Sequence, residues 1–361
     1  LGRFNAKEKI NITVKSKNLI VNGKETNAQE VLIKKEPSSG ESFIEVNKRK
    51  YRGIIKVNLT QGKNSLTVVN ILPVEQYLYG VIAKEISPEW PIESVTAEAV
   101  AARSYALANV NKHEKDGYDV CATTDCQVYW GKDSEAPGAL KAVQDTYGQV
   151  LMYQGKIVPA YFHASSGGYT ENSENVWGSY SVYMSGVSDY DQKSPYYRWE
   201  KSFLPREITE LLNKSGYNIG VLKGIDVSPL TAPPMTAADR GVSGRVKLIR
   251  FIGSLGTAEI KGGENLRRIL GLRSSLVDFQ IIMPVQPSLD IGIIDRTGNY
   301  ETKSLEINVP PIKKKEFLKE KDTLRRLSGR EGETVLITGF GWGHGLGLSQ
   351  WGAKAMAEQA K

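Results

Sequence analysis

Short runs of β-branched and aliphatic residues dominate the first 74 positions of the chain. Several of them alternate apolar with polar residues, as in I-N-I-T-V and G-I-I-K-V-N-L. This period of two is typical of strands that bury one face. The N-G, S-S-G and Q-G-K-N segments between the runs are typical of turns. We therefore expect residues 1–70 to form an N-terminal β-rich module.

The hydrophobic pattern changes at Pro73. Over residues 74–86 the apolar side chains recur at a helical spacing, and the Ser87-Pro88 pair that follows predicts the end of this helix. Residues 92–112 give the strongest helical pattern of the chain. Because they include the run E-A-V-A-A-R-S-Y-A-L-A-N-V, with many small side chains, we expect this second helix to pack closely against its neighbours.

The remaining pattern mixes strands and short helices. A hairpin is predicted to turn at Gln154-Gly155, a Gly/Ser/Asn-rich loop follows it, and V-L-I-T-G-F is predicted to be a strand that precedes a terminal helix. Two further short helices are expected at 206–212 and near 264–270. The sequence thus predicts an α+β fold, in which helices and antiparallel sheets surround a cleft. We expect one domain over 71–361, with an irregular insertion near 283–330.

Composition and charge narrow the class of protein. The chain has 361 residues, of which 40% are hydrophobic and 24% charged, as is usual for a globular protein. No apolar run approaches the roughly 18 residues of a membrane span. No signal peptide is present, but the sequence starts at Leu1, so this absence carries no information about location.

The net charge of +7 favours polyanionic partners such as nucleic acid, anionic lipid or an acidic cell wall. The tightest basic run, I-K-K-K-E-F-L-K-E-K, is interleaved with Glu, which is typical of a solvated helix. The chain also lacks the alternation of aromatic and basic residues found in single-strand binders. We therefore expect no nucleic-acid partner.

The two cysteines of the chain, Cys121 and Cys126, stand in C-A-T-T-D-C. They are too few for a disulfide-stapled scaffold. In an oxidising compartment they could form one disulfide. They could also be half of a zinc site, for which His113 and Asp125 lie close in the sequence. Two free thiols are a third alternative, and the residues alone leave all three open.

Glu85 and Glu89 are the carboxylates of V-I-A-K-E-I-S-P-E-W-P. Glu85 falls in the last turn of the first predicted helix, where the helix dipole and flanking apolar residues both raise a carboxyl pKa. A carboxylic acid that stays protonated near neutral pH is suited to general acid catalysis. On position alone a surface Glu is the more frequent outcome, and Glu89 is predicted to be such a residue.

Arg103 interrupts a run of small residues in the second predicted helix. An Arg in such surroundings is rarely left unpaired. One interpretation is a structural salt bridge, with Glu98 or with another acid. The other is that Arg103 orients a carboxylate or binds an anionic substrate group.

Two further motifs carry polar or aromatic side chains. In Y-F-H-A-S-S-G-G a serine hydrolase is disfavoured, because G-x-S-x-G is absent. His163 is better explained as a hydrogen-bonded structural residue. The run G-F-G-W-G-H-G-L-G-L-S-Q-W-G matches neither a Walker A nor a dinucleotide fingerprint. Its residues Trp342 and Trp351 are either platforms for sugar rings or the core of a Gly-rich turn.

Taken together and in order, these motifs resemble the SpoIID/LytB family, which comprises stage II sporulation protein D and the amidase-enhancer LytB proteins. The resemblance runs from about residue 50 to the C-terminus. The matching segments include V-V-N-I-L-P-V-E-Q-Y-L-Y-G-V-I-A-K-E-I, W-P-I-E-S-V-T-A-E-A-V-A-A-R-S-Y-A, C-Q-V-Y-W-G, A-V-Q-D-T-Y-G-Q-V-L, S-S-G-G-Y-T-E-N-S-E-N-V-W-G, S-G-R-V-K, R-R-I-L-G-L-R-S-S and G-W-G-H-G-L-G-L-S-Q-W-G-A.

The resemblance implies a lytic transglycosylase that cleaves denuded glycan strands of peptidoglycan between MurNAc and GlcNAc and leaves 1,6-anhydroMurNAc ends. One acid suffices for this reaction, because the nucleophile is the substrate's own C6 hydroxyl. The family's catalytic acid matches Glu85. The LytB branch implies the alternative, a wall-binding enhancer of an N-acetylmuramoyl-L-alanine amidase that has no chemistry of its own.

The resemblance also suggests site residues and a location. The residues expected to bind substrate are Arg103, Lys201, Ser165, Ser166, Asn172, Trp342 and His344. Members with a zinc site carry His where this chain has Asp125, which favours a Cys121–Cys126 disulfide over zinc, and no cofactor is expected to be required. We expect an extracytoplasmic protein, at the wall or membrane-anchored, and at the forespore-engulfing membrane if it serves sporulation. The presence of the N-terminal β-rich module slightly favours a vegetative, LytB-like member over a sporulation protein.

Overall fold

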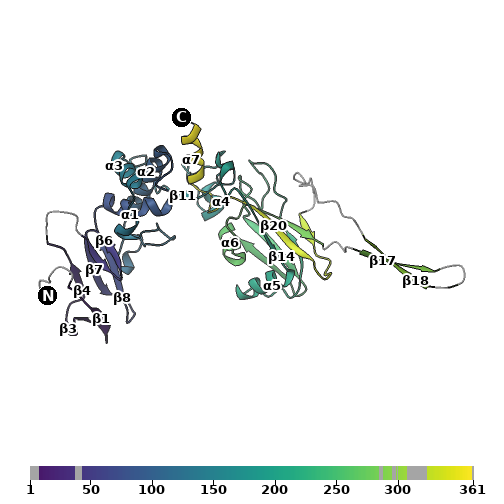
Figure 1. The fold of residues 1–361 in the computed structure, drawn as a ribbon, viewed down its shortest axis with the longest axis horizontal. Coiled ribbons are helices and arrows are strands. Elements are labelled where there is room, and N and C mark those ends of the chain that lie inside the picture. The colour runs from purple at the N-terminus through teal and green to yellow at the C-terminus, as the bar shows by residue number, and fades with distance from the viewer. Residues whose placement is uncertain are drawn as a thin grey trace. The chain divides into compact units, whose positions relative to one another are not determined.

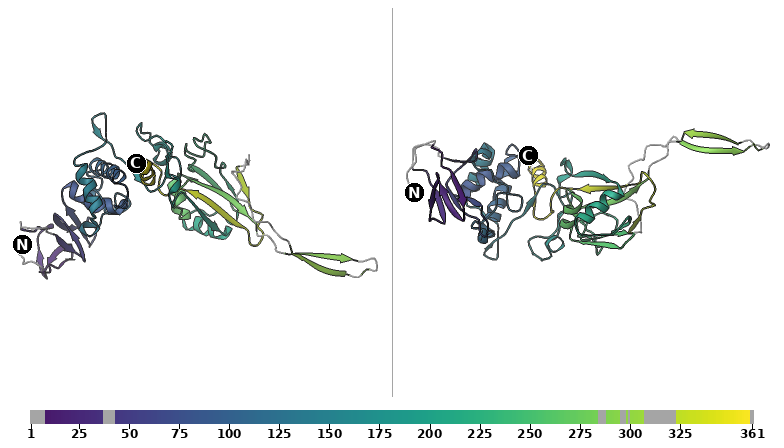
Figure 2. Two further views of the ribbon diagram at one scale, coloured as in Figure 1. Left: turned by 45° about the horizontal axis from the view of Figure 1, so that its top comes forward. Right: turned by 90° about the horizontal axis from the view of Figure 1, so that it is seen from below.

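The structure is a computed structural model and describes residues 8–36, 43–283, 288–294, 298, 300–306 and 323–359. The chain forms two compact units (Figures 1 and 2). The first consists of Leu1–Phe162 with Ala353–Lys361, and the second of His163–Gly352. Helices and antiparallel sheets occur together, so the predicted α+β class is confirmed.

The first unit begins with the strands expected from the alternating pattern. Strand pairing is antiparallel throughout, and the first small core consists of Leu19, Val21 and Val31. The three sheets are β1 (Ile12–Lys15), β2 (Asn18–Val21) and β3 (Lys24–Thr26); β4 (Glu30–Ile33), β7 (Ile54–Leu59) and β8 (Leu66–Ile71); and the pair β5 (Ile44–Val46) and β6 (Arg49–Tyr51).

Three helices follow the strands: α1 (Val74–Glu85), α2 (Ile92–Ala108) and α3 (Pro137–Asp145). They bury Leu78, Ile82 and Ala102 in one core. Helix α1 ends within one residue of its predicted end, whereas α2 ends four residues before position 112. Helix α3 was not predicted, although Pro at its first position is a usual start signal.

The rest of the first unit consists of short elements. These are the 3-10 turns η1 (Glu114–Asp116) and η2 (Gly131–Ser134), the hairpin β9 (Met152–Tyr153) and β10 (Lys156–Ile157), and the end of α7 (Gln350–Gln359). The hairpin turns at Gln154-Gly155, as predicted. Both of these residues have positive φ, at 47° and 75°, as a tight hairpin turn requires.

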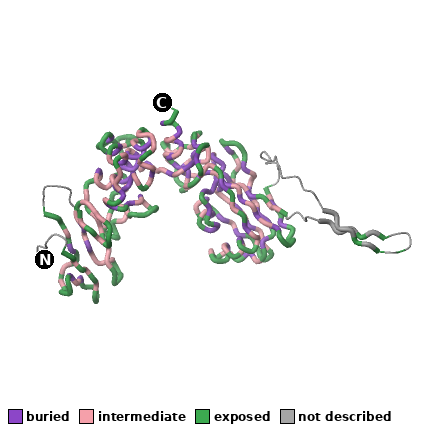
Figure 3. Tube along the Cα trace, viewed as in Figure 1, coloured by how far each residue is buried: buried purple, intermediate pink, exposed green. Residues whose placement is uncertain are grey.

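The second unit is built around two antiparallel sheets. One has the order β12 (Arg198–Phe203), β20 (Thr334–Phe340) and β16 (Val277–Ile282); the other has β15 (Thr257–Lys261), β14 (Leu248–Gly253), β13 (Leu222–Asp226) and β19 (Leu324–Arg326). Figure 3 shows buried residues along these strands. With α5 (Pro205–Lys214) and α6 (Gly263–Leu270) they enclose a core that includes Phe251, Phe279 and Ile337.

Short elements complete this unit: β11 (Phe162–His163), α4 (Ser173–Trp177), η3 (Asp191–Lys193), the antiparallel pair β17 (Ser288–Ile294) and β18 (Tyr300–Glu306), and β21 (Leu348–Ser349). Helix α4 lies where a loop was predicted. The pair β17–β18 occupies part of the predicted insertion near 283–330, and the basic run 312–321 lies outside the described residues.

Two expectations about organisation stay predictions. The boundary predicted at residue 70 falls near the end of β8, just before the change from strands to helices, and lies within the first unit. The second expectation, a cleft surrounded by helices and antiparallel sheets, also stays a prediction. Among the described residues, no helix has the length and apolar character needed to cross a membrane.

Candidate active site

Glu85 is the last residue of α1, immediately before the extended residue Ile86. Its side chain is half-buried, and its Oε1 accepts a hydrogen bond of 2.6 Å from the backbone N–H of Val128. Burial raises the pKa of the Glu85 carboxyl, and the bond from Val128 partly opposes this shift. Oε2 has no hydrogen-bond partner in the described part of the chain. The carboxyl is thus fixed at one oxygen and able to donate a proton at the other.

The segment that holds Glu85 is itself anchored on both sides. The hydroxyl of Tyr77, two turns earlier on α1, donates to Oε1 of Gln127 over 3.1 Å. The amide of the fully buried Gln127 donates to the carbonyl of Ala102 in α2 over 3.2 Å. Burial, with Cys126 and Glu85 nearby, raises the pKa of Tyr77, so its hydroxyl stays protonated. Two helices therefore fix the peptide from which Val128 donates.

Arg103 forms a buried salt bridge, and its partner is Glu75 rather than Glu98. The guanidinium is fully buried and binds both carboxylate oxygens of Glu75, at 2.9 and 2.7 Å. Its remaining donors face the Thr146 hydroxyl and the carbonyls of Val143 and Gln149. The expected contact with substrate would require this network to open, so the geometry does not favour it.

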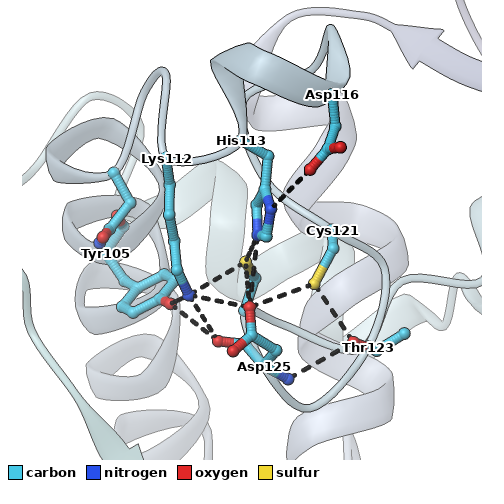
Figure 4. Close-up of polar contacts among 9 residues, drawn as sticks. Tyr105, Lys112, His113, Asp116, Cys121, Thr123 and Asp125 are labelled. Carbon is cyan, nitrogen blue, oxygen red and sulfur yellow. Dashed lines mark hydrogen bonds and ion pairs between the residues drawn. The ribbon is translucent and has the colours of Figure 1, made fainter. Parts of the chain in front are cut away.

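A second cluster lies on the first unit, in the loop after α2. One ligand atom from each of His113, Cys121, Asp125 and Cys126 lies within 4.8 Å of the other three. Figure 4 shows the side chains of His113, Cys121 and Asp125 converging, with the Lys112 ammonium beside them. The amine of Lys112 binds Oδ2 of Asp125 at 3.1 Å. Two sulfurs, an imidazole and a carboxylate are a donor set that suits zinc.

The spacing of these atoms tests the fit to zinc. Bonds of about 2.0–2.3 Å in a tetrahedron separate neighbouring ligand atoms by about 3.3–3.8 Å. Nε2 of His113 lies 3.3 Å from Sγ of Cys126 and 3.3 Å from Oδ2 of Asp125. The same oxygen lies 3.7 Å from Sγ of Cys126 and 3.8 Å from Sγ of Cys121. These four residues therefore fit a tetrahedral metal ion.

The cysteines are free thiols in the structure, which departs from the disulfide favoured by the sequence. Burial opposes ionisation of the Cys121 thiol, but hydrogen bonding with Thr123 outweighs it and lowers the pKa of Cys121. A lowered thiol pKa favours metal binding, since the thiolate is the ligand. On the other side of the His113 ring, Oδ2 of Asp116 lies 3.7 Å from Nδ1, where a carboxylate orients an imidazole ligand.

The serines predicted to bind substrate lie on the second unit and are buried. Ser165 donates to Asp191, and Ser166 donates to Asp189 over 2.5 Å. Nδ1 of His163 lies 3.0 Å from the carbonyl of Leu346. Because neither serine is paired with a histidine, the geometry gives no support to a serine hydrolase. The hydrogen bond of His163 agrees with its predicted structural character.

The other expected sugar contacts on this unit are more accessible. Asn172 accepts a bond of 2.7 Å from the N–H of Gly186 and precedes α4. Trp342 is 40% exposed, with the edge of Tyr196 against it at 4.6 Å between ring centroids. The His344 ring lies 5.3 Å from that of Trp177, which also has an exposed face. These aromatic surfaces are compatible with carbohydrate binding, which stays a prediction.

Lys201 has an observed partner of a different kind. Its ammonium donates to the carbonyls of Leu270 and Gly271 at 2.9 and 3.1 Å, at the C-terminal end of α6. A cation there satisfies terminal carbonyls and complements the helix dipole. Binding of substrate by Lys201 stays a prediction, and it would compete with this cap.

The predicted residues fall into two groups. Glu85, Arg103 and the two cysteines lie on the first unit, and the serines, Asn172, Trp342, His344 and Lys201 lie on the second. Sequence analysis missed Val128, because a backbone N–H leaves no signal in side-chain identity. It also did not identify Glu75 as the partner of Arg103, since it named only Glu98 or an unspecified acid.

Comparison with known proteins gives consistent matches. The model of the SpoIID family, stage II sporulation protein, matches residues 62–153. Stage II sporulation protein D of Bacillus amyloliquefaciens is 30% identical over 81% of this chain and 71% of that protein. An amidase enhancer of Bacillus subtilis is 28% identical over 96% of this chain and 47% of that protein.

An uncharacterized protein of Brachyspira hyodysenteriae is also similar, with 28% identity over 82% of this chain. The chain spans 65% of that relative's length. This relative and the amidase enhancer are therefore both considerably longer than the region that they share with this chain.

Proposed function

Because this chain belongs to the SpoIID/LytB family of stage II sporulation protein D and amidase-enhancer proteins, we propose that it is a peptidoglycan lytic transglycosylase in which Glu85 is both acid and base. The observation that carries the proposal is the state of Glu85: a half-buried carboxyl with a raised pKa, held at one oxygen by Val128. Such a group is protonated at a higher pH than an exposed Glu, as a general acid must be.

The reaction needs only this one acid. Glu85 donates its proton to the glycosidic oxygen between MurNAc and GlcNAc, and the bond from C1 of MurNAc to that oxygen breaks. GlcNAc leaves with a 4-hydroxyl, and positive charge develops at C1. The C6 hydroxyl of the same MurNAc then attacks C1, and its proton passes to the Glu85 carboxylate. The ring closes as 1,6-anhydroMurNAc, no water is consumed, and the acid is restored.

Zinc at His113, Cys121, Asp125 and Cys126 is part of this proposal. Bound there, the ion would tie the loop after α2 together and would keep both thiols as thiolates. Cys126 lies two residues before Val128, so the same backbone segment contributes to the metal site and to the Glu85 contact. The metal's proposed task is to hold this segment in place.

A second candidate function is enhancement of a partner amidase. The match to the amidase enhancer extends over 96% of this chain, whereas the match to the sporulation protein of Bacillus amyloliquefaciens extends over 81%. This wider match favours a wall-binding enhancer that recruits or positions an N-acetylmuramoyl-L-alanine amidase. For either function we propose an extracytoplasmic location, at the cell wall or at a membrane surface facing it.

The two functions differ in what the purified protein does alone. Incubation with denuded glycan strands, followed by mass spectrometry, should yield fragments with 1,6-anhydro-muramyl ends. If no such fragments form, but a partner amidase releases stem peptides faster when the protein is added, the enhancer function is correct.

A further inference from the structure

Two cations that come from different elements of the first unit contact the indole of Trp130. The Arg49 guanidinium, on β6, lies 4.6 Å from the centroid of the indole. The Lys84 ammonium, on α1, lies 3.9 Å from it. The indole is 43% exposed. Cation–π attraction holds each cation against this ring.

The backbone around Trp130 is fixed by contacts with β6. Gly131 has φ of 69°, and a Cβ there would lie 2.4 Å from the carbonyl oxygen of Lys50. The N–H of Lys50 in turn donates to the Asp133 carboxylate over 2.9 Å. The turn that carries Trp130 is therefore docked directly on the strand that carries Arg49.

The nearby acids of this turn do not neutralise the two cations. Asp133 accepts the Lys50 N–H, and Glu135 is bound at both oxygens by Arg52, at 2.5 and 2.7 Å. Among the described residues, neither Arg49 nor Lys84 forms an ion pair with a carboxylate. The two cations at Trp130 thus lack an acidic partner within the described part of the chain.

Lys84 and Trp130 are close in sequence to the candidate acid and to the residue that binds it. Lys84 precedes Glu85 on α1, and Trp130 lies two residues after Val128, whose N–H binds Glu85. Lys84 and Trp130 therefore belong to the same two segments that carry Glu85 and Val128. Arg103, which the sequence had suggested for binding an anionic substrate group, is buried and bound to Glu75.

We infer that Arg49 and Lys84, stacked on Trp130, bind the carboxylate of the glycan's muramic lactyl side chain. The inference rests on the proposed function, since it names the group that this site recognises in its substrate. It predicts that the protein binds strands containing muramic acid more tightly than uncharged glycans. The reason is that the lactyl carboxylate would form charge-assisted hydrogen bonds with Arg49 and Lys84.

The test measures binding without turnover, in Glu85→Gln protein. Isothermal titration compares denuded glycan strands with the same strands after chemical reduction of their carboxylates to alcohols. Arg49→Gln and Lys84→Gln should each weaken binding of intact strands about tenfold or more and leave binding of reduced strands unchanged. Lys156→Gln removes an exposed cation of the same unit and should change neither.

Equal losses on intact and reduced strands, or no loss on either, would overturn the inference, provided that circular dichroism shows folded variants. The inference would also be overturned if Arg49→Gln and Lys84→Gln weakened binding of a glycerol-phosphate polymer but left binding of the glycan unchanged. If the Glu85→Gln protein binds no glycan at all, the inference fails together with the proposed function. If 1,6-anhydro products form while the two variants bind normally, only the inference fails.

Discussion

The backbone N–H of Val128 donates to Oε1 of Glu85 over 2.6 Å, and Val128 follows Cys126 by two residues. One short segment therefore connects the candidate acid to the cluster that fits a metal ion. A change at the metal site should therefore move the Val128 N–H and alter its hydrogen bond to Glu85.

The activity should depend on pH through Glu85. Burial raises the pKa of its carboxyl, so the acid stays protonated to a higher pH than an exposed Glu does. The rate kcat/KM on denuded strands should fall as the pH rises through this raised pKa, because the proton donor is lost. A pH–rate profile checks this. An alkaline limb at the usual pKa of an exposed Glu would contradict it.

Removal of one partner from the Arg103–Glu75 pair should destabilise the first unit. Both side chains are buried, so Arg103→Met or Glu75→Leu leaves a buried charge and should cost about 3–5 kcal/mol in the free energy of unfolding. The double variant should recover most of this loss. Denaturant unfolding of all four proteins measures the coupling.

This pair also tests whether Arg103 binds substrate. If it did, the double variant would be stable but would bind glycan strands much more weakly than the parent. Our structural assignment predicts that the stable double variant keeps its affinity, because the guanidinium faces Glu75 and not solvent.

Zinc should bind in a one-to-one ratio and should stabilise the protein. We expect elemental analysis to find one equivalent, and chelation to lower the melting temperature, because the ion binds the folded loop. Cys126→Ser should abolish this change in melting temperature. If Cys121 and Cys126 instead formed a disulfide, chelation would not change the melting temperature of the parent protein. Lys115→Gln, an exposed residue of the same loop, is the matched control.

The second unit should lose stability in acid through His163. Burial, with His344 and Arg245 nearby, holds the pKa of His163 well below its ordinary value, so the folded state binds this proton only at low pH. The unfolded state binds it below a pH of about 6.5. Since the unfolded state then binds more protons, the free energy of unfolding should fall as the pH drops below that value.

The matched variant is His163→Asn, which keeps a side-chain donor for the Leu346 carbonyl. Its free energy of unfolding should vary less between pH 6.5 and the folded-state pKa than that of the parent. Parallel curves for the two proteins would show that another group is responsible.

Local patterns predicted the elements around Glu85 well. The apolar spacing of α1 and the Ser87-Pro88 stop placed its end, and the alternation of the first strands was equally clear. Partners that lie far apart in the sequence were harder to predict. Arg103 and Glu75 are separated by 28 residues, and the sequence offered only Glu98 as a named partner. His113 also converges with Asp125 and the two cysteines from a separate turn, which spacing alone does not fix.

The most direct test of the central claim is glycan cleavage in water enriched in heavy oxygen, with products weighed by mass spectrometry. Glu85→Gln is compared with the parent and with Glu89→Gln, which changes an exposed carboxylate near the same helix end. We predict that the parent and Glu89→Gln release 1,6-anhydro ends that carry no heavy oxygen, and that Glu85→Gln releases none. Heavy oxygen at the new reducing ends, or full activity in Glu85→Gln, would contradict the claim that Glu85 alone drives an anhydro-forming cleavage.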